Sequence, residues 1–166
     1  VRAYDKESNL GNLFADALLQ YDPSIDLALV NSGALRQNID EGPVTKGDLV
    51  STFPFPNKLV LVKLKGSRLR AIFDHAAKMT NGVLQVSKGT RYEFEAGKGV
   101  QEISINGRRL EDEKLYWVAT SDFVVEGGDG YSEFDHAVER VDTGKKIVDV
   151  VEDFLVQERI YYPVYE

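Results

Sequence analysis

The sequence contains no cysteine in its 166 residues, so it can form neither a disulfide framework nor a thiolate zinc site. It has only two histidines, His75 and His136, and neither belongs to an HxxH or HExxH motif. A two-metal phosphoesterase centre needs several histidines and carboxylates that converge on the ions. We therefore expect no metal centre and no cofactor within this chain, and we interpret both histidines as surface or packing residues.

Other enzyme signatures are also missing. The chain has no GxSxG nucleophile elbow, no Walker loop and no GxGxxG fingerprint. Charged residues interrupt every apolar stretch, so we expect no membrane span. The net charge of −7 disfavours binding to a nucleic-acid polymer. A small anionic ligand remains compatible with that charge, because one or two local arginines can hold a phosphate.

The chain begins Val1-Arg2-Ala3, with neither a start methionine nor a signal peptide. We expect it to be a segment of a longer protein. Its length suits one compact domain, and no linker or internal repeat divides it. The sequence therefore predicts a single domain over residues 1–166.

Apolar residues at spacings of three and four predict three amphipathic helices. They run from Ser8 or Asn9 to about Gln20, from Gly66 onward, and after Thr143. Thr45 and Asp48 form the pattern of a capping box for a further helical turn. Strands are expected at residues 25–31, 59–64, 83–86, 91–94, 100–105 and 116–120, with a hairpin turn at 106–107. This order predicts an α+β domain with a mixed β-sheet packed by three main helices.

The motif NSGALR at residues 31–36 directly follows a predicted buried strand. Ligands of open sheets lie just beyond the carboxyl ends of such strands. Gly33 would let the backbone approach a ligand closely, and Arg36 could hold phosphate oxygens with two parallel hydrogen bonds. Taken alone, the motif is also compatible with an ordinary loop that ends in a surface arginine.

Two further loops carry aromatic or acidic side chains. The FPF motif at residues 53–55 sets rings on a rigid loop, where they could stack on a base or fill a core edge. The GGDGY motif at residues 127–131 turns sharply and projects Asp129, a carboxylate that could accept hydrogen bonds from ribose hydroxyls. Phe123 precedes that loop and offers another ring. Together the loops supply a phosphate-binding arginine, two stacking rings and a ribose-binding carboxylate, although GGDG alone could be a structural turn.

Four motifs together resemble a known family. ESNLGNL at residues 7–13, then NSGALR, FPF and GGDGY, occur in the order seen in the C-terminal, substrate-binding domain of 5'-nucleotidases and UDP-sugar hydrolases. The resemblance covers most of the chain, from about Glu7 to Pro163.

The resemblance implies a division of labour. An N-terminal metallophosphoesterase domain or subunit would hold two divalent metals and hydrolyse the phosphate ester, and this chain alone would be inactive. This chain would bind the nucleotide or nucleoside, and the parent protein would be extracellular, periplasmic or on the cell surface. By position, the substrate-binding residues would be Asn31, Gly33, Arg36, Phe55, Phe123, Gly128 and Asp129, with Phe55 and Phe123 on either side of the base.

The chain departs from the family pattern in two places. Tyr4 stands where the family usually has an arginine, and Arg2 or Lys6 could compensate for it. Ser32 and Ala34 replace glycines, and we expect their side chains to narrow the pocket or to change how the backbone approaches the ligand. One alternative stays open, a stand-alone, non-catalytic nucleotide-binding module. An interaction domain that has lost the pocket is disfavoured, because the candidate pocket residues are intact.

Overall fold

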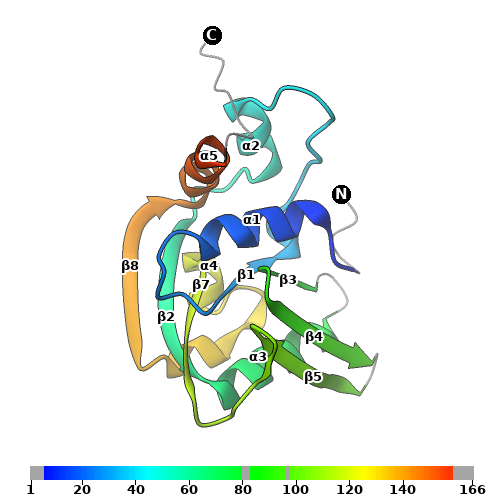
Figure 1. Ribbon diagram of the computed structural model, residues 1–166, viewed down its shortest axis with the longest axis vertical. Coiled ribbons are helices and arrows are strands. Elements are labelled where there is room, and N and C mark those ends of the chain that lie inside the picture. The colour runs from blue at the N-terminus through cyan, green and yellow to red at the C-terminus, as the bar shows by residue number, and fades with distance from the viewer. Residues whose placement is uncertain (1–5, 80–82, 96–97, 159–166) are drawn as a thin grey trace.

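The computed structural model describes residues 6–79, 83–95 and 98–158 (Figure 1). Within these ranges the helices are α1 (Asn9–Leu19), α2 (Lys46–Thr52), α3 (Gly66–Lys78), α4 (Asp122–Val125) and α5 (Ile147–Gln157). The strands are β1 (Leu27–Asn31), β2 (Lys58–Lys65), β3 (Leu84–Val86), β4 (Thr90–Glu95), β5 (Gly99–Ile105), β6 (Arg108–Arg109), β7 (Leu115–Ser121) and β8 (Glu139–Lys146). Short 3-10 turns lie at η1 (Ser32–Ala34), η2 (Gly128–Gly130) and η3 (Ser132–His136).

The strands form two sheets. The larger sheet is mixed and has the order β3-β1-β7-β2-β8, in which β1 and β7 are parallel and the other pairs are antiparallel. The smaller sheet is antiparallel, with the order β4-β5-β6. The expected α+β domain with a mixed sheet is confirmed. The sequence did not show that three of its strands form a separate sheet.

Strand β1 contributes to a core on each face of the large sheet, because successive side chains of a strand point to opposite faces. Ala28 and Val30 pack in the cluster that contains α1 and α5 residues. Leu27 and Leu29 pack in the cluster that contains α3 residues. Figure 1 shows α1 crossing in front of β1 and β7, with α3 near β4 and β5 in the lower part of the molecule. All five residues of β1 are buried, so the loop that follows it starts from a rigid position.

The predicted helix starts are confirmed. The Ser8 hydroxyl caps α1 by accepting a hydrogen bond from the Gly11 amide at 3.0 Å. Thr45 and Asp48 form both hydrogen bonds of a capping box at α2, and the hydroxyl of Thr45 lowers the pKa of Asp48 by donating to its carboxylate. Helix α3 begins at Gly66, where a Cβ would overlap the Glu111 carbonyl.

Strand β8 was not predicted. Its residues have the sequence ERVDTGKK, and all except Thr143 are exposed. An edge strand with this composition lacks the apolar alternation that indicates a strand. It is held by pairing with β2 and by the Thr143 hydroxyl, which donates to the Leu59 carbonyl at 2.7 Å. Helix α5 follows at Ile147, in agreement with a helix beginning after Thr143.

Tyr92 gives the fold a pH-dependent contribution to stability. Its hydroxyl donates to the Leu84 carbonyl at 2.9 Å, and burial raises its pKa to about 12. Because the phenol of an unfolded chain titrates near pH 10, this contribution is complete below about pH 10 and is lost between about pH 10 and 12.

Above about pH 10 the free energy of unfolding should decrease less steeply with pH in Tyr92→Phe than in the unmodified chain. Loss of the hydrogen bond should cost about 0.5–1.5 kcal/mol at pH 7. Some slope should remain, since burial also raises the pKa of Tyr131. Urea unfolding at pH 7, 10 and 11 measures this, and identical slopes in the two proteins would contradict it.

Candidate functional site

The carboxyl end of β1 carries the first group of candidate residues. Asn31 is the last residue of the strand and is buried, and Gly33 lies in the η1 turn that follows. Arg36 is exposed, and its amide donates to the Thr52 carbonyl at 2.8 Å. This bond ties the loop after β1 to the end of α2, so Arg36 projects from a fixed backbone.

The two phenylalanine rings of the FPF loop lie in different environments. Phe53 is fully buried and stacks on Phe14, with ring centroids 5.9 Å apart. Phe55 is half-buried and meets Phe53 edge-on at 5.9 Å. The guanidinium carbon of Arg36 lies 5.4 Å from the centre of the Phe55 ring, within cation–π range. Phe53 is therefore a core residue, and Phe55 is the ring available to a ligand.

The carboxyl end of β7 carries the second ring. Ser121 caps α4 by accepting from the Val124 amide at 3.2 Å, and Phe123 in this helix is 43% exposed. The Asp122 carboxylate accepts from the Phe123 amide at 2.8 Å. It also accepts from the side-chain amide of Asn57, again at 2.8 Å. Asn57 therefore joins the FPF loop to the Phe123 segment.

The GGDGY loop brings Asp129 to the end of β1. The Asn31 side-chain amide donates to Asp129 Oδ2 at 2.9 Å. Asp129 has a left-handed backbone, with φ 55°, a conformation that aspartate adopts more readily than most residues. Gly128 has no room for a side chain, because a Cβ would lie 2.5 Å from both the carbonyl oxygen and Cε1 of Phe123. The loop therefore packs directly against Phe123.

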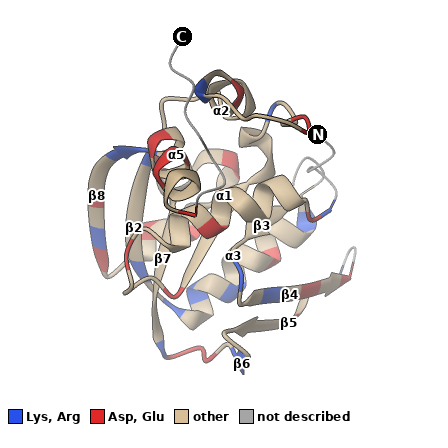
Figure 2. Ribbon diagram, turned by 45° about the horizontal axis from the view of Figure 1, so that its top comes forward, with Lys and Arg blue, Asp and Glu red and all other residues tan. Residues whose placement is uncertain are grey.

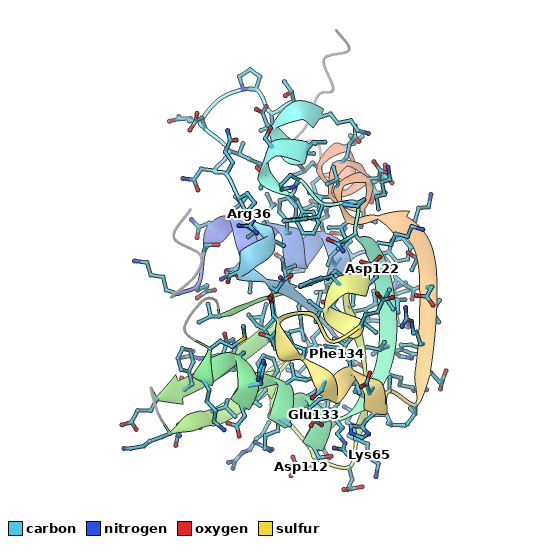
Figure 3. All side chains as sticks on the ribbon, turned by 180° about the vertical axis from the view of Figure 1, so that it is seen from behind. Arg36, Lys65, Asp112, Asp122, Glu133 and Phe134 are labelled. Carbon is cyan, nitrogen blue, oxygen red and sulfur yellow. The ribbon has the colours of Figure 1, made fainter. Side chains whose placement is uncertain are left out.

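The loop after β1, the FPF loop, α4 and the GGDGY loop enclose one pocket with a volume of about 230 Å³. Figure 3 shows the elements that carry it, with Arg36 and Asp122 labelled. The volume is below the roughly 300–1,000 Å³ of pockets that enclose a drug-sized ligand, so it suits part of a nucleotide better than a whole one. The lining residues are Asn31, Gly33, Ala34, Arg36, Phe55, Asn57, Phe123 and Asp129.

Six of the seven predicted substrate-binding residues line this pocket. The seventh, Gly128, does not line the pocket but packs closely against Phe123. Asn57 was missed, since nothing in the sequence indicates that it reaches Asp122, 65 positions along the chain.

Ala34 lines the pocket and Ser32 does not, so the expectation that the Ser32 side chain narrows the pocket was wrong. The effect of these residues on how the backbone approaches a ligand stays a prediction. Ser32 is buried, donates to the Val83 carbonyl and accepts from Gln85 Nε2 at 3.1 Å. Its hydroxyl is therefore engaged by the β3 segment and does not narrow the pocket. Tyr4 and Arg2 lie outside the described residues, and Lys6 does not line this pocket.

Within residues 6–79, 83–95 and 98–158, no group of three or more histidines and carboxylates could hold a metal ion. His75 instead forms a hydrogen bond with the Asp129 carbonyl, so it is engaged in the fold. Acidic and basic residues are interspersed along the described elements (Figure 2). In the same part of the chain, no helix is long and apolar enough to cross a bilayer.

The comparisons with known proteins point to one family. Residues 1–136 match the family model described as 5'-nucleotidase, C-terminal domain. The chain is 29% identical to a 5'-nucleotidase of Diplobatis ommata, over 98% of this chain and 33% of that protein. It is 31% identical to the protein UshA of Yersinia enterocolitica, over 90% of this chain and 27% of that protein.

A solved structure agrees with these relatives. The 5'-nucleotidase precursor from Thermus thermophilus is similar, with 32% sequence identity and a TM-score of 0.85, over 96% of this chain and 34% of that one. The chain therefore spans between about a quarter and a third of the length of these three proteins.

Proposed function

The chain belongs to the family of 5'-nucleotidase C-terminal domains, and from this premise we propose that its pocket binds the nucleoside part of a nucleotide. One observation carries the proposal. Three segments that are distant in the sequence bring two phenylalanine rings, a carboxylate and an arginine to a single pocket. A nucleotide-binding site needs surfaces on which the base can stack. It also needs a hydrogen-bond acceptor for the ribose hydroxyls and a hydrogen-bond donor for the phosphate oxygens.

In this proposal, Phe55 and Phe123 stack on the two faces of the base. Base–aromatic stacking contributes roughly 1–3 kcal/mol per base in nucleic-acid systems and tolerates any base, because every base has a π-face. Both rings line the pocket and come from rigid supports: Phe55 packs on the core residue Phe53, and Phe123 is held by its own helix start. Little ordering is then required when the base enters, which favours binding.

Asp129 and Arg36 bind the remaining parts of the nucleotide. The Asp129 carboxylate accepts hydrogen bonds from the ribose hydroxyls, with Asn31 holding Oδ2 in place. Arg36 is exposed at the pocket and donates to phosphate oxygens. An exposed arginine on a lone domain offers only part of a phosphate site, so the phosphate adds little affinity here.

Hydrolysis belongs to a part of the protein outside this chain. The described residues provide no donor set for a metal, so we assign the two divalent metals and the activation of water to an N-terminal metallophosphoesterase domain or subunit. The greater length of the relatives supports this division. The resemblance also supports an extracellular, periplasmic or cell-surface location for the parent protein.

We expect calorimetry with adenosine, AMP and UMP to show weak binding by the purified chain, with a Kd on the order of 1 mM, or about −4 kcal/mol. The affinities for adenosine and AMP should be similar, because the phosphate site is incomplete. When Mn²⁺ is added to the purified chain together with AMP, no phosphate should be released. Absence of heat with all three ligands would contradict the pocket, and metal-dependent release of phosphate would contradict the division of labour.

A further inference from the structure

His75 supports the pocket, although it is not one of the residues that line it. His75 lies on α3, and its Nε2 atom is 2.8 Å from the carbonyl oxygen of Asp129, 54 positions later. A carbonyl can only accept, so Nε2 carries the hydrogen and donates it. The imidazole also meets the Tyr131 ring edge-on, with centroids 4.8 Å apart. His75 therefore connects a core helix to the loop that carries the carboxylate.

This loop needs such a support because its backbone is unusual. Gly127, Asp129 and Gly130 all have positive φ, with values of 85°, 55° and 83°. A non-glycine residue in the left-handed region persists where the surrounding structure fixes it. The loop has internal bonds from the Gly130 amide to Gly127 and from the Tyr131 amide to Gly128. Neither bond involves the carbonyl of Asp129, which is the group that His75 holds.

Asp129 is thus fixed at two points. Asn31 donates to its side chain at Oδ2, and His75 donates to its backbone. With the backbone carbonyl pinned toward α3, the carboxylate is directed to the pocket that it lines. Without that bond, the peptide between Asp129 and Gly130 could rotate, although Asn31 would still hold the side chain.

We propose that His75 is a positioning residue that gives the pocket its preference for ribose. Its hydrogen bond to the Asp129 carbonyl holds the carboxylate where both ribose hydroxyls reach it. This inference rests on the proposed binding of a nucleoside. In this proposal the preference for ribose depends on a residue of α3, whereas base stacking depends on the FPF loop and α4. The two contributions are therefore separable by mutation.

The test compares adenosine with 2',3'-dideoxyadenosine, which lacks both hydroxyls, by calorimetry. The unmodified chain should prefer adenosine by about tenfold or more, because a hydrogen bond to a charged group adds that much affinity. His75→Ala should reduce the preference to about threefold or less while the affinity for the dideoxynucleoside stays within about twofold. His75→Gln, whose amide can donate from a similar distance, should restore most of the preference. His136→Ala changes the other, exposed histidine and should behave as the unmodified chain.

Amide hydrogen exchange tests the same role without a ligand. The Gly130 and Tyr131 amides should exchange faster in His75→Ala than in the unmodified chain or in His136→Ala. Unchanged exchange at these amides would overturn the positioning role even if no nucleoside bound. An equal loss of affinity for both nucleosides in His75→Ala would also overturn it. Failure of the unmodified chain to bind either nucleoside would instead contradict the proposed function, and the exchange result would still decide the role of His75.

Discussion

Replacement of Phe123 by alanine is expected to weaken adenosine binding by about 5- to 150-fold, or 1–3 kcal/mol, because the base loses one of its two stacking partners. The ring is 43% exposed, so its removal should leave the fold intact. The backbone of this segment keeps its bond to Asp122, since that bond uses the Phe123 amide. Calorimetry of the variant, with a thermal melt to verify folding, measures the effect.

Phe94→Ala provides a matched control. Phe94 is 40% exposed, close to the exposure of Phe123, but it lies on β4 of the small sheet and packs on Tyr92. It does not line the pocket. Adenosine should bind this variant as it binds the unmodified chain. Unchanged binding by Phe123→Ala, or equal weakening by both variants, would show that the ring does not stack on the base.

Gly128→Ala should weaken adenosine binding by more than about tenfold, since overpacking forces backbone shifts. The added Cβ would lie 2.5 Å from the Phe123 carbonyl oxygen, and a backbone atom cannot swing aside as the end of a side chain can. The loop must therefore move, and it carries Asp129 with it. The same shift should lower the free energy of unfolding by about 1–3 kcal/mol.

Gly47→Ala is the corresponding control for adding a methyl group. Gly47 is exposed on α2, and the nearest atom to its added Cβ is Thr45 Oγ1, at an ordinary 3.5 Å. Alanine in a helix should stabilise the fold by about 0.5–1 kcal/mol relative to glycine, without a change in adenosine affinity. If Gly128→Ala bound adenosine as well as Gly47→Ala does, the close packing of the GGDGY loop on Phe123 would have no role in binding.

The sequence predicted the features that depend on local patterns. The apolar spacing of Leu13, Phe14 and Leu18 indicates α1, and the Thr45 and Asp48 pair indicates the start of α2. The candidate residues could also be named, because strand ends and glycine-rich turns mark loops. That six of the seven gather at one pocket is a finding of the structure, whereas their role in binding a nucleotide stays a prediction.

The features that were missed depend on partners far along the chain. Strand β8 exists because β2 lies beside it, and its own residues carry little apolar signal. Ser32 bonds to the β3 segment, and no local pattern indicates where its side chain points. Asn57 and His75 act through Asp122 and Asp129, contacts that form only when the sheet and α3 are assembled. Local pattern carries no information about such pairs.

A crystal structure of this chain soaked with AMP would test the central claim most directly. We expect the base between Phe55 and Phe123, both ribose hydroxyls within hydrogen-bond distance of the Asp129 carboxylate, and the phosphate on the side of Arg36. A nucleotide bound elsewhere on the surface, or a pocket that stays free of ligand at a concentration well above the Kd from calorimetry, would contradict the assignment of this pocket to nucleoside recognition.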